Sequence, residues 1–241
     1  MIIPVYNNEG TIADVVGRTL LHCDDVIVVN DGSADSTKEC LERIAGITII
    51  NSPKNEGKGS ALRRGFRKAL DLGFAYAITL DADGQHYPED IPRFLDANIE
   101  HPGCLIVGSR DLTGVVRSKG SSFANSFSNF WFCVQTLHRL PDTQTGYRLY
   151  PLKKLKGLSF LTSRYEAELE LLVFASWHGV KLISKPINVF YPKPEERVSH
   201  FRPGLDFTRI SILNTILCVL AVIYGIPCFL YRSLKTGLFT I

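Results

Sequence analysis

Short apolar runs alternate with amphipathic segments along the first half of the chain. The apolar runs, which we predict to be strands, are residues 2–5, 26–30, 47–51, 76–80 and 105–109. Between them, apolar positions recur with helical spacing, which predicts helices over residues 11–21, 36–44, 59–72 and 88–99. Strands that alternate with helices form a mostly parallel sheet covered on both faces. The sequence therefore predicts a Rossmann-like α/β fold.

This alternation ends after residue 110. Residues 121–137, rich in serine and aromatic side chains, predict a helix, and residues 142–150 predict a loop and a strand. Residues 164–178 predict another helix, and residues 180–189 predict a last strand.

The C-terminal region differs from the rest because residues 210–231 contain no charged side chain. Arg209 precedes this run, and Arg232 and Lys235 follow it. The run is long enough to cross a bilayer. A helix lying in the membrane interface, divided at Pro227, and a buried helix of a soluble core are the alternatives. We expect a globular domain over residues 1–205 and a membrane-associated segment over residues 206–241.

Composition narrows the class of protein. A chain of 241 residues, 45% hydrophobic and 21% charged, fits one globular domain. The net charge of +3 is too small to indicate a nucleic-acid partner. Six scattered cysteines lack metal-ligand spacing and are interpreted as reduced thiols. The first strand begins at residue 2, which leaves open whether residues precede Met1, and the oligomeric state stays unknown.

Carboxylates follow the strand predicted at residues 76–80. Asp81, Asp83 and Gln85 offer oxygen ligands at the carboxyl end of that strand, where α/β sheets bind ligands. Mg²⁺ or Mn²⁺ held by so few ligands keeps open positions for phosphate. The motif therefore predicts a nucleotide diphosphate held through a metal. Taken alone, it is equally typical of a turn that begins the helix at Pro88.

Other polar groups end neighbouring strands. Tyr6 and Asp31 follow the first and second strands, and Lys58 lies between two glycines where a helix begins and could bring a cation near phosphate. Each segment alone could be an ordinary turn. Their common position at one edge of the sheet favours a binding site.

Ordered motifs add a family resemblance. The strings IPVYN (residues 3–7), NDGSxDxT (30–37), NxGKGxA (55–61), DADGQ (81–85) and GSR (108–110) resemble family-two glycosyltransferases of GT-A fold. The strings DTQTGYR (142–148) and RVSHF (197–201) resemble the dolichyl- or polyprenyl-phosphate sugar synthases within that family. The resemblance covers roughly residues 2–205.

The resemblance implies a role for each matching residue. Pro4, Tyr6, Asp31 and the backbone at Val29 would hold the nucleoside, with Asn8, Glu9 and Lys58 also on the donor side. Asp81, Ala82 and Asp83 would hold ribose and diphosphate, and Asp81, Asp83 and Gln85 would surround the metal. Arg110 would contact the donor, and Asp142, Gln144 and Arg148 would face the sugar and acceptor. Arg197, Ser199 and His200 would close over the diphosphate.

Two positions depart from the family pattern. Asn8 stands where the lipid-phosphate synthases usually carry Glu, with Glu9 shifted by one position, so one nucleoside contact is in doubt. His200 stands where they commonly carry Lys, which would make closure over the phosphates sensitive to pH.

The resemblance implies an enzyme that transfers a sugar from GDP-mannose or a UDP-sugar to a polyprenyl phosphate, with inversion. We expect it at the cytoplasmic face of a membrane, such as the bacterial inner membrane. A phosphate acceptor needs cations, for which Arg148 and Arg164 are candidates. A hydroxyl acceptor, the main alternative, needs a base such as Asp142 or Glu166. A non-catalytic nucleotide-binding domain is a further alternative.

Overall fold

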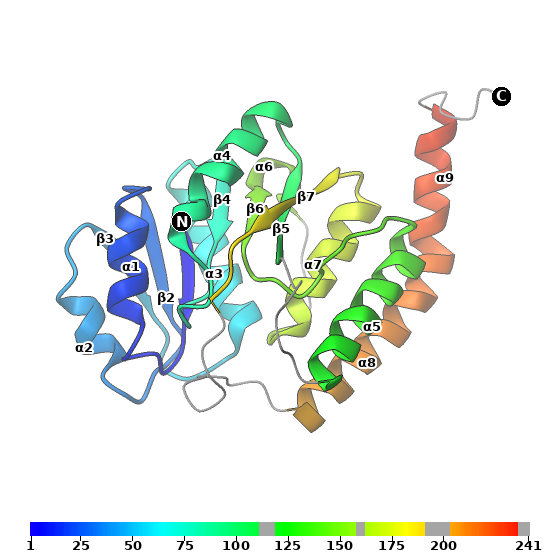
Figure 1. Ribbon diagram of the computed structural model, residues 1–241. Helices are drawn as coiled ribbons and strands as arrows, with labels where there is room; N and C mark the ends of the chain where they lie inside the picture. The colour runs from blue at the N-terminus through cyan, green and yellow to red at the C-terminus, as the bar shows by residue number, and fades with distance from the viewer. Residues whose placement is uncertain (111–118, 158–161, 191–202, 236–241) are drawn as a thin grey trace.

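The computed structural model describes residues 1–110, 119–157, 162–190 and 203–235. Its centre is a seven-stranded sheet of order β3-β2-β1-β4-β6-β5-β7 (Figure 1). The strands are β1 (Ile2–Val5), β2 (Val26–Asn30), β3 (Ile47–Asn51), β4 (Tyr76–Thr79), β5 (Leu105–Arg110), β6 (Arg148–Pro151) and β7 (Leu182–Ile187). Only β6 is antiparallel to its neighbours β4 and β5 among the strands described.

Helices connect these strands and cover the sheet. They are α1 (Ile12–Leu20), α2 (Thr37–Glu42), α3 (Lys58–Asp71), a 3₁₀ turn at Pro88–Asp90, α4 (Ile91–Glu100), α5 (Lys119–Thr136), α6 (Leu152–Leu155), α7 (Glu166–Trp177), α8 (Pro203–Leu220), a π-helical turn at Ala221–Gly225 and α9 (Ile226–Lys235). The predicted ranges agree with these elements to within a few residues at each end.

Successive residues of each strand pack into different cores, because side chains alternate between the two faces of a sheet. Ile3 and Val28 pack in a core with residues of α1, α2 and α4. Ile2 and Val29 belong to the core that includes residues of α3, α5, α7 and α8. Helices therefore cover both faces of a mostly parallel sheet, which confirms the predicted fold class.

The C-terminal run is one continuous helical segment, residues 204–235, and is long and apolar enough to cross a membrane by length and composition. Pro227 does not divide it. A proline removes a backbone donor from the preceding turn, and the π-helical turn lies at that point. In Figure 1, α9 extends beyond the body of the domain, at the end opposite β3.

The first half of this segment packs into the domain. Leu213, Leu217 and Ala221 are buried in the core formed with α5 and α7. The Gln135 amide on α5 donates to Asn214 Oδ1 at 2.9 Å. The expected boundary between residues 205 and 206 falls inside α8, and the inner face of this helix contributes to the core of the domain.

Candidate active site

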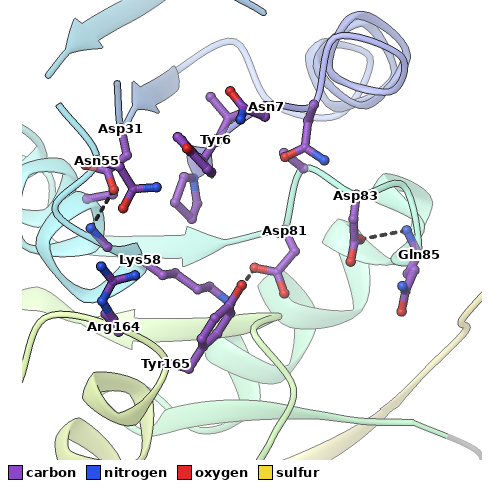
Figure 2. A pocket seen from close by; sticks show the side chains of 16 residues that line it. Tyr6, Asn7, Asp31, Asn55, Lys58, Asp81, Asp83, Gln85, Arg164 and Tyr165 are labelled. Atoms are coloured by element: carbon purple, nitrogen blue, oxygen red, sulfur yellow. Dashed lines mark hydrogen bonds and ion pairs between the residues drawn. The ribbon is translucent and has the colours of Figure 1, made fainter. Parts of the chain in front are cut away.

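A cavity of about 530 Å³ lies at the carboxyl ends of β1, β2 and β4. Figure 2 shows its polar side chains converging from these strand ends and from the starts of α3 and α7. Eleven of the lining residues carry polar side chains: Tyr6, Asn7, Asn8, Asp31, Asn55, Lys58, Asp81, Asp83, Gln85, Arg164 and Tyr165. The structure therefore brings together most of the donor-side residues predicted from the sequence.

Asp31 has a structural task at this site. Its Oδ2 accepts hydrogen bonds from the backbone N–H of Gly57 at 2.6 Å and of Glu56 at 3.1 Å. Gly57 has a φ of +100°, and a β-carbon there would lie 2.5 Å from the carbonyl oxygen of Ser163. Only glycine allows this close approach. Asp31 and Gly57 thus fix the loop that directs Lys58 into the cavity.

Glu9 lies away from the cavity lining. Its Oε2 accepts from the N–H of Ser36, immediately before α2. The backbone N–H of Asn8 donates to Thr37 Oγ1 at 2.9 Å, and the Asn8 residue lines the cavity. Pro4 and Ala82 line the cavity. The Val29 side chain is buried in the core, so a nucleoside contact there stays a prediction for its backbone.

Lys58 is held between two carboxylates. Its Nζ lies 2.6 Å from Asp81 Oδ1 and 2.7 Å from Glu168 Oε2. Figure 2 shows the lysine side chain reaching from α3 to Asp81. Burial acts to lower the pKa of Lys58, but the two carboxylates outweigh it and raise that pKa. Burial acts to raise the pKa of Asp81, and Lys58 overcomes it, so Asp81 is ionised.

Asp81, Asp83 and Gln85 line the cavity and carry the oxygen donors that Mg²⁺ and Mn²⁺ prefer. Burial, followed by the neighbouring Asp81 charge, raises the pKa of Asp83 to about 6. A cation between the two carboxylates would relieve this repulsion. The described residues contain no cluster of three His, Cys, Asp or Glu side chains suited to a metal. The amide of Gln85 and phosphate oxygens would therefore have to complete the ligand set.

Gly146 keeps the space beside Asp81 open. A β-carbon at this position would lie 2.5 Å from Asp81 Oδ2 and 2.7 Å from Lys58 Nζ. The hydroxyl of Thr79 donates to the Gly146 carbonyl at 2.6 Å, which fixes the glycine against β4. The loop before β6 thus passes directly beside the proposed metal ligand.

Arg148 does not face the cleft, contrary to our expectation. Its side chain is fully buried, with Nε 2.7 Å from the Thr145 carbonyl, Nη2 2.9 Å from the Thr143 carbonyl and Nη1 2.8 Å from the Glu168 carbonyl. The antiparallel strand β6, which begins at Arg148, directs this side chain inward. Arg148 braces the loop over residues 143–145 and is not placed to contact an acceptor.

Asp142 pairs with Arg110, so two predicted site residues neutralise each other. Arg110 Nε lies 2.6 Å from Asp142 Oδ2, and Arg110 Nη2 lies 2.9 Å from Asp142 Oδ1. Asp142 Oδ1 also accepts from the N–H of Gln144 at 3.1 Å. Asp142 is only 1% exposed, and neither it nor Arg110 is among the cavity-lining residues.

Arg197, Ser199 and His200 lie outside the described residues. The described chain before them reaches the loop that contains Gln85, because the N–H of Phe190 donates to the Gln85 carbonyl at 2.8 Å. Sequence reasoning missed Tyr165 and Glu168. A signal for Glu168 existed in the string EAELELL (residues 166–172), in which three carboxylates alternate with apolar residues.

A comparison with sequence families identifies the chain as a glycosyltransferase. The sequence model of the family described as "Glycosyl transferase family 2" matches residues 1–153, so the chain belongs to that family. This confirms the resemblance and the predicted enzyme class.

Two proteins are similar to this chain in sequence, and one solved structure is similar to it in fold. The chain is 30% identical over 220 residues to the UDP-N-acetylglucosamine–dolichyl-phosphate N-acetylglucosaminyltransferase of Methanococcus voltae, which covers 79% of this chain and 85% of that protein. It is 31% identical over 204 residues to the polyprenol monophosphomannose synthase of Mycolicibacterium smegmatis, covering 78% and 75%. The fold is similar to that of glucosyl-3-phosphoglycerate synthase from Mycobacterium tuberculosis, solved with Mn²⁺, UDP and phosphoglyceric acid. That match has a TM-score of 0.67 at 18% sequence identity, and it covers 91% of this chain and 76% of the synthase.

Proposed function

We propose that this glycosyltransferase transfers a sugar from a nucleotide-diphosphate sugar to a polyprenyl phosphate, with inversion, at the cytoplasmic face of a membrane. Similar proteins support the acceptor class, because their names give dolichyl phosphate and a polyprenol product. They differ in donor, so a UDP-sugar and GDP-mannose are both candidates for this chain.

The negative charge on the leaving diphosphate must be neutralised by groups in the cavity. Cleavage of the bond between sugar and diphosphate leaves negative charge on the diphosphate. Asp81, Asp83 and Gln85 would hold Mg²⁺ or Mn²⁺, which when bound neutralises part of that charge. Arg164 lines the cavity and adds a cation on the far side of Lys58 (Figure 2). Arg197, Ser199 and His200 are proposed to contact the same diphosphate.

The pairing of Asp142 with Arg110 supports a phosphate rather than a hydroxyl group as the acceptor. A hydroxyl acceptor needs a base to remove its proton, whereas a phosphate is already ionised and attacks directly. Asp142 is buried with both oxygens bonded to Arg110. Glu166 is also buried and is not among the cavity-lining residues. Neither base expected from the sequence is open to an acceptor, which supports an anionic acceptor.

Exposed apolar side chains support membrane association. Helix α8 packs beside α5, and Phe127 of α5 contacts Phe207 of α8 with ring centroids 5.7 Å apart. Several exposed residues lie on these helices and the turn that follows α8: Phe123, Phe130, Val134, Ile212, Ile216, Val219, Val222 and Ile223. Exposed apolar residues gathered in this way are typical of surfaces that contact lipid or another protein.

Transfer assays with matched acceptors test this proposal. The purified chain in detergent is supplied with UDP-sugars or GDP-mannose, Mn²⁺, and either a short polyprenyl phosphate or the polyprenol of equal length. We expect an organic-phase product only with the phosphate, inverted at the anomeric carbon by NMR, and no product with excess chelator. Transfer to the polyprenol alone would favour the hydroxyl-acceptor alternative.

A further inference from the structure

A buried chain of charges connects the proposed metal site to α7. Asp81 contacts Lys58, and Lys58 contacts Glu168 on the first turns of α7. The side chains of Lys58 and Glu168 are 16% and 8% exposed. Charges this poorly hydrated act strongly on one another, because little water screens them.

Glu168 contributes to this chain through its charge. One carboxylate oxygen, Oε2, contacts Lys58, whereas the other, Oε1, is buried with no hydrogen-bond partner among the described residues. An unsatisfied buried oxygen is costly. A neutral side chain could accept from Lys58 with a single oxygen and avoid a second buried charge. The carboxylate therefore places a second negative charge beside Lys58, in addition to that of Asp81.

The backbone of Glu168 helps to hold the loop that precedes β6. Its carbonyl accepts from Arg148 Nη1 at 2.8 Å, and Arg148 holds the carbonyls of Thr143 and Thr145. The loop so braced contains Gly146, which lies beside Asp81. One residue therefore joins the lysine that contacts Asp81 to the loop that shapes the space around Asp81.

We propose that Glu168 is a positioning residue that keeps Asp81 available to a divalent cation by sharing the charge of Lys58. Without Glu168, the ammonium of Lys58 is balanced by Asp81 alone and competes with the metal for that carboxylate. With Glu168 present, the ammonium is shared by two carboxylates, and Asp81 retains more negative charge toward the cavity. This inference rests on the metal site assigned in the proposed function.

Mn²⁺ binding tests the inference without relying on turnover. Free Mn²⁺ is measured by electron paramagnetic resonance with the full chain, in the presence of UDP and, separately, of GDP. We expect Glu168→Gln to weaken Mn²⁺ binding by roughly tenfold, the size of effect typical of losing one partly buried charge. The matched control is Glu170→Gln, on the same helix, whose carboxylate bonds to Thr162. It should leave Mn²⁺ affinity within about twofold of wild type.

A double-mutant cycle shows whether Glu168 acts through Lys58. In a Lys58→Met background no ammonium is left to share, so adding Glu168→Gln should change Mn²⁺ affinity by less than about twofold. If Glu168→Gln alone does not fold, the comparison within the Lys58→Met background can still overturn the inference. A tenfold loss in the Lys58→Met background would overturn the inference.

The possible failures are distinguishable. If the wild type binds no Mn²⁺ with either nucleotide, the metal site of the proposed function is wrong. If the wild type binds Mn²⁺ and Glu168→Gln binds it equally well while melting at a lower temperature, Glu168 is only structural and this inference alone is wrong.

Discussion

Asp142 is held by Arg110, through contacts of 2.6 Å and 2.9 Å, rather than by Arg148. Arg148 instead donates to the carbonyls of Thr143 and Thr145, in the loop that precedes β6, and to the carbonyl of Glu168 on α7. Two arginines that the sequence suggested for ligand contact are thus committed to bracing. Arg164 makes no ion pair within the described part of the chain and lines the cavity, which leaves it as a candidate to contact phosphate.

The first prediction concerns Arg148. Arg148→Lys cannot reproduce three hydrogen bonds from one planar guanidinium, and it leaves buried carbonyls unsatisfied. We expect a loss of about 2–4 kcal/mol in the free energy of unfolding, with nucleotide binding and transfer falling together. Thermal melts, calorimetry with UDP and GDP, and the transfer assay measure these changes.

Arg164→Lys is the comparison variant for Arg148→Lys. It should lower transfer by about tenfold or more with little change in melting temperature, because Arg164 lines the cavity and is only partly buried. If Arg148→Lys reduced transfer while stability and nucleotide binding stayed at wild-type values, the bracing role would be wrong.

The sequence predicted the sheet better than the site. Strands such as Val26–Asn30 are apolar up to their last residue, and that signal is local. The inward direction of Arg148 depends on β6 lying antiparallel between β4 and β5, a tertiary arrangement that no local pattern encodes. The pairing of Glu168 with Lys58 likewise joins helices distant in the sequence. Asp81 and Asp83 were predictable because strand ends meet at one edge of a sheet.

Gly146 gives the second prediction. In Gly146→Ala the added methyl group would meet Asp81 Oδ2 and Lys58 Nζ, so the proposed metal ligand must move. We expect Mn²⁺ affinity to fall at least about tenfold, a loss of roughly 1.4 kcal/mol. The matched control is Gly17→Ala on α1, where the new methyl group meets no atom within 4 Å. It should stabilise the helix by up to about 1 kcal/mol and leave Mn²⁺ binding unchanged. Equal Mn²⁺ affinity in both variants would contradict the assigned site.

The third prediction concerns Asp83 and pH. With a pKa of about 6, Asp83 is protonated at lower pH, and a protonated carboxyl is a poor metal ligand. Below that pH, Mn²⁺ affinity should therefore fall by about tenfold for each pH unit. Asp83→Ala should reduce transfer by more than about a hundredfold and remove most of the pH dependence of binding. Mn²⁺ titrations of wild type and variant at pH values on both sides of the Asp83 pKa measure this dependence. A wild-type Mn²⁺ affinity that does not change with pH would show that Asp83 is not a ligand.

The fourth prediction concerns the stability contributed by His86. Burial lowers the pKa of His86 from 6.5 to about 4. Between these values the unfolded state binds more protons than the folded state, so stability falls as the pH is lowered through this window. The full loss for a shift of this size is about 3 kcal/mol.

Chemical denaturation in the presence of chelator measures the free energy of unfolding as a function of pH. Comparing wild type with His86→Asn isolates the contribution of His86. The variant should lose less stability on acidification than the wild type. The raised pKa of Asp83 acts in the opposite direction, but it is present in both proteins and largely cancels in the comparison. Parallel stability curves for the two proteins would exclude His86 as the source.

The last prediction concerns the apolar outer face of α8 and the turn that follows it. Truncation before α8 would uncover the core, because Leu213 and Leu217 are buried against α5 and α7, so point substitutions are the cleaner test. Ile216 and Ile223 are 50% and 67% exposed. Replacing both with Glu should leave nucleotide binding intact and weaken membrane binding by more than about a hundredfold, since each charge is costly in a bilayer. Flotation with vesicles of phosphatidylcholine and phosphatidylglycerol measures this, with Ile99→Glu on α4, also exposed, as the matched control. The double variant should lose transfer to long-chain acceptors more than to short-chain ones. A wild-type protein that stays soluble without detergent and does not float with vesicles would show that this face does not contact the membrane.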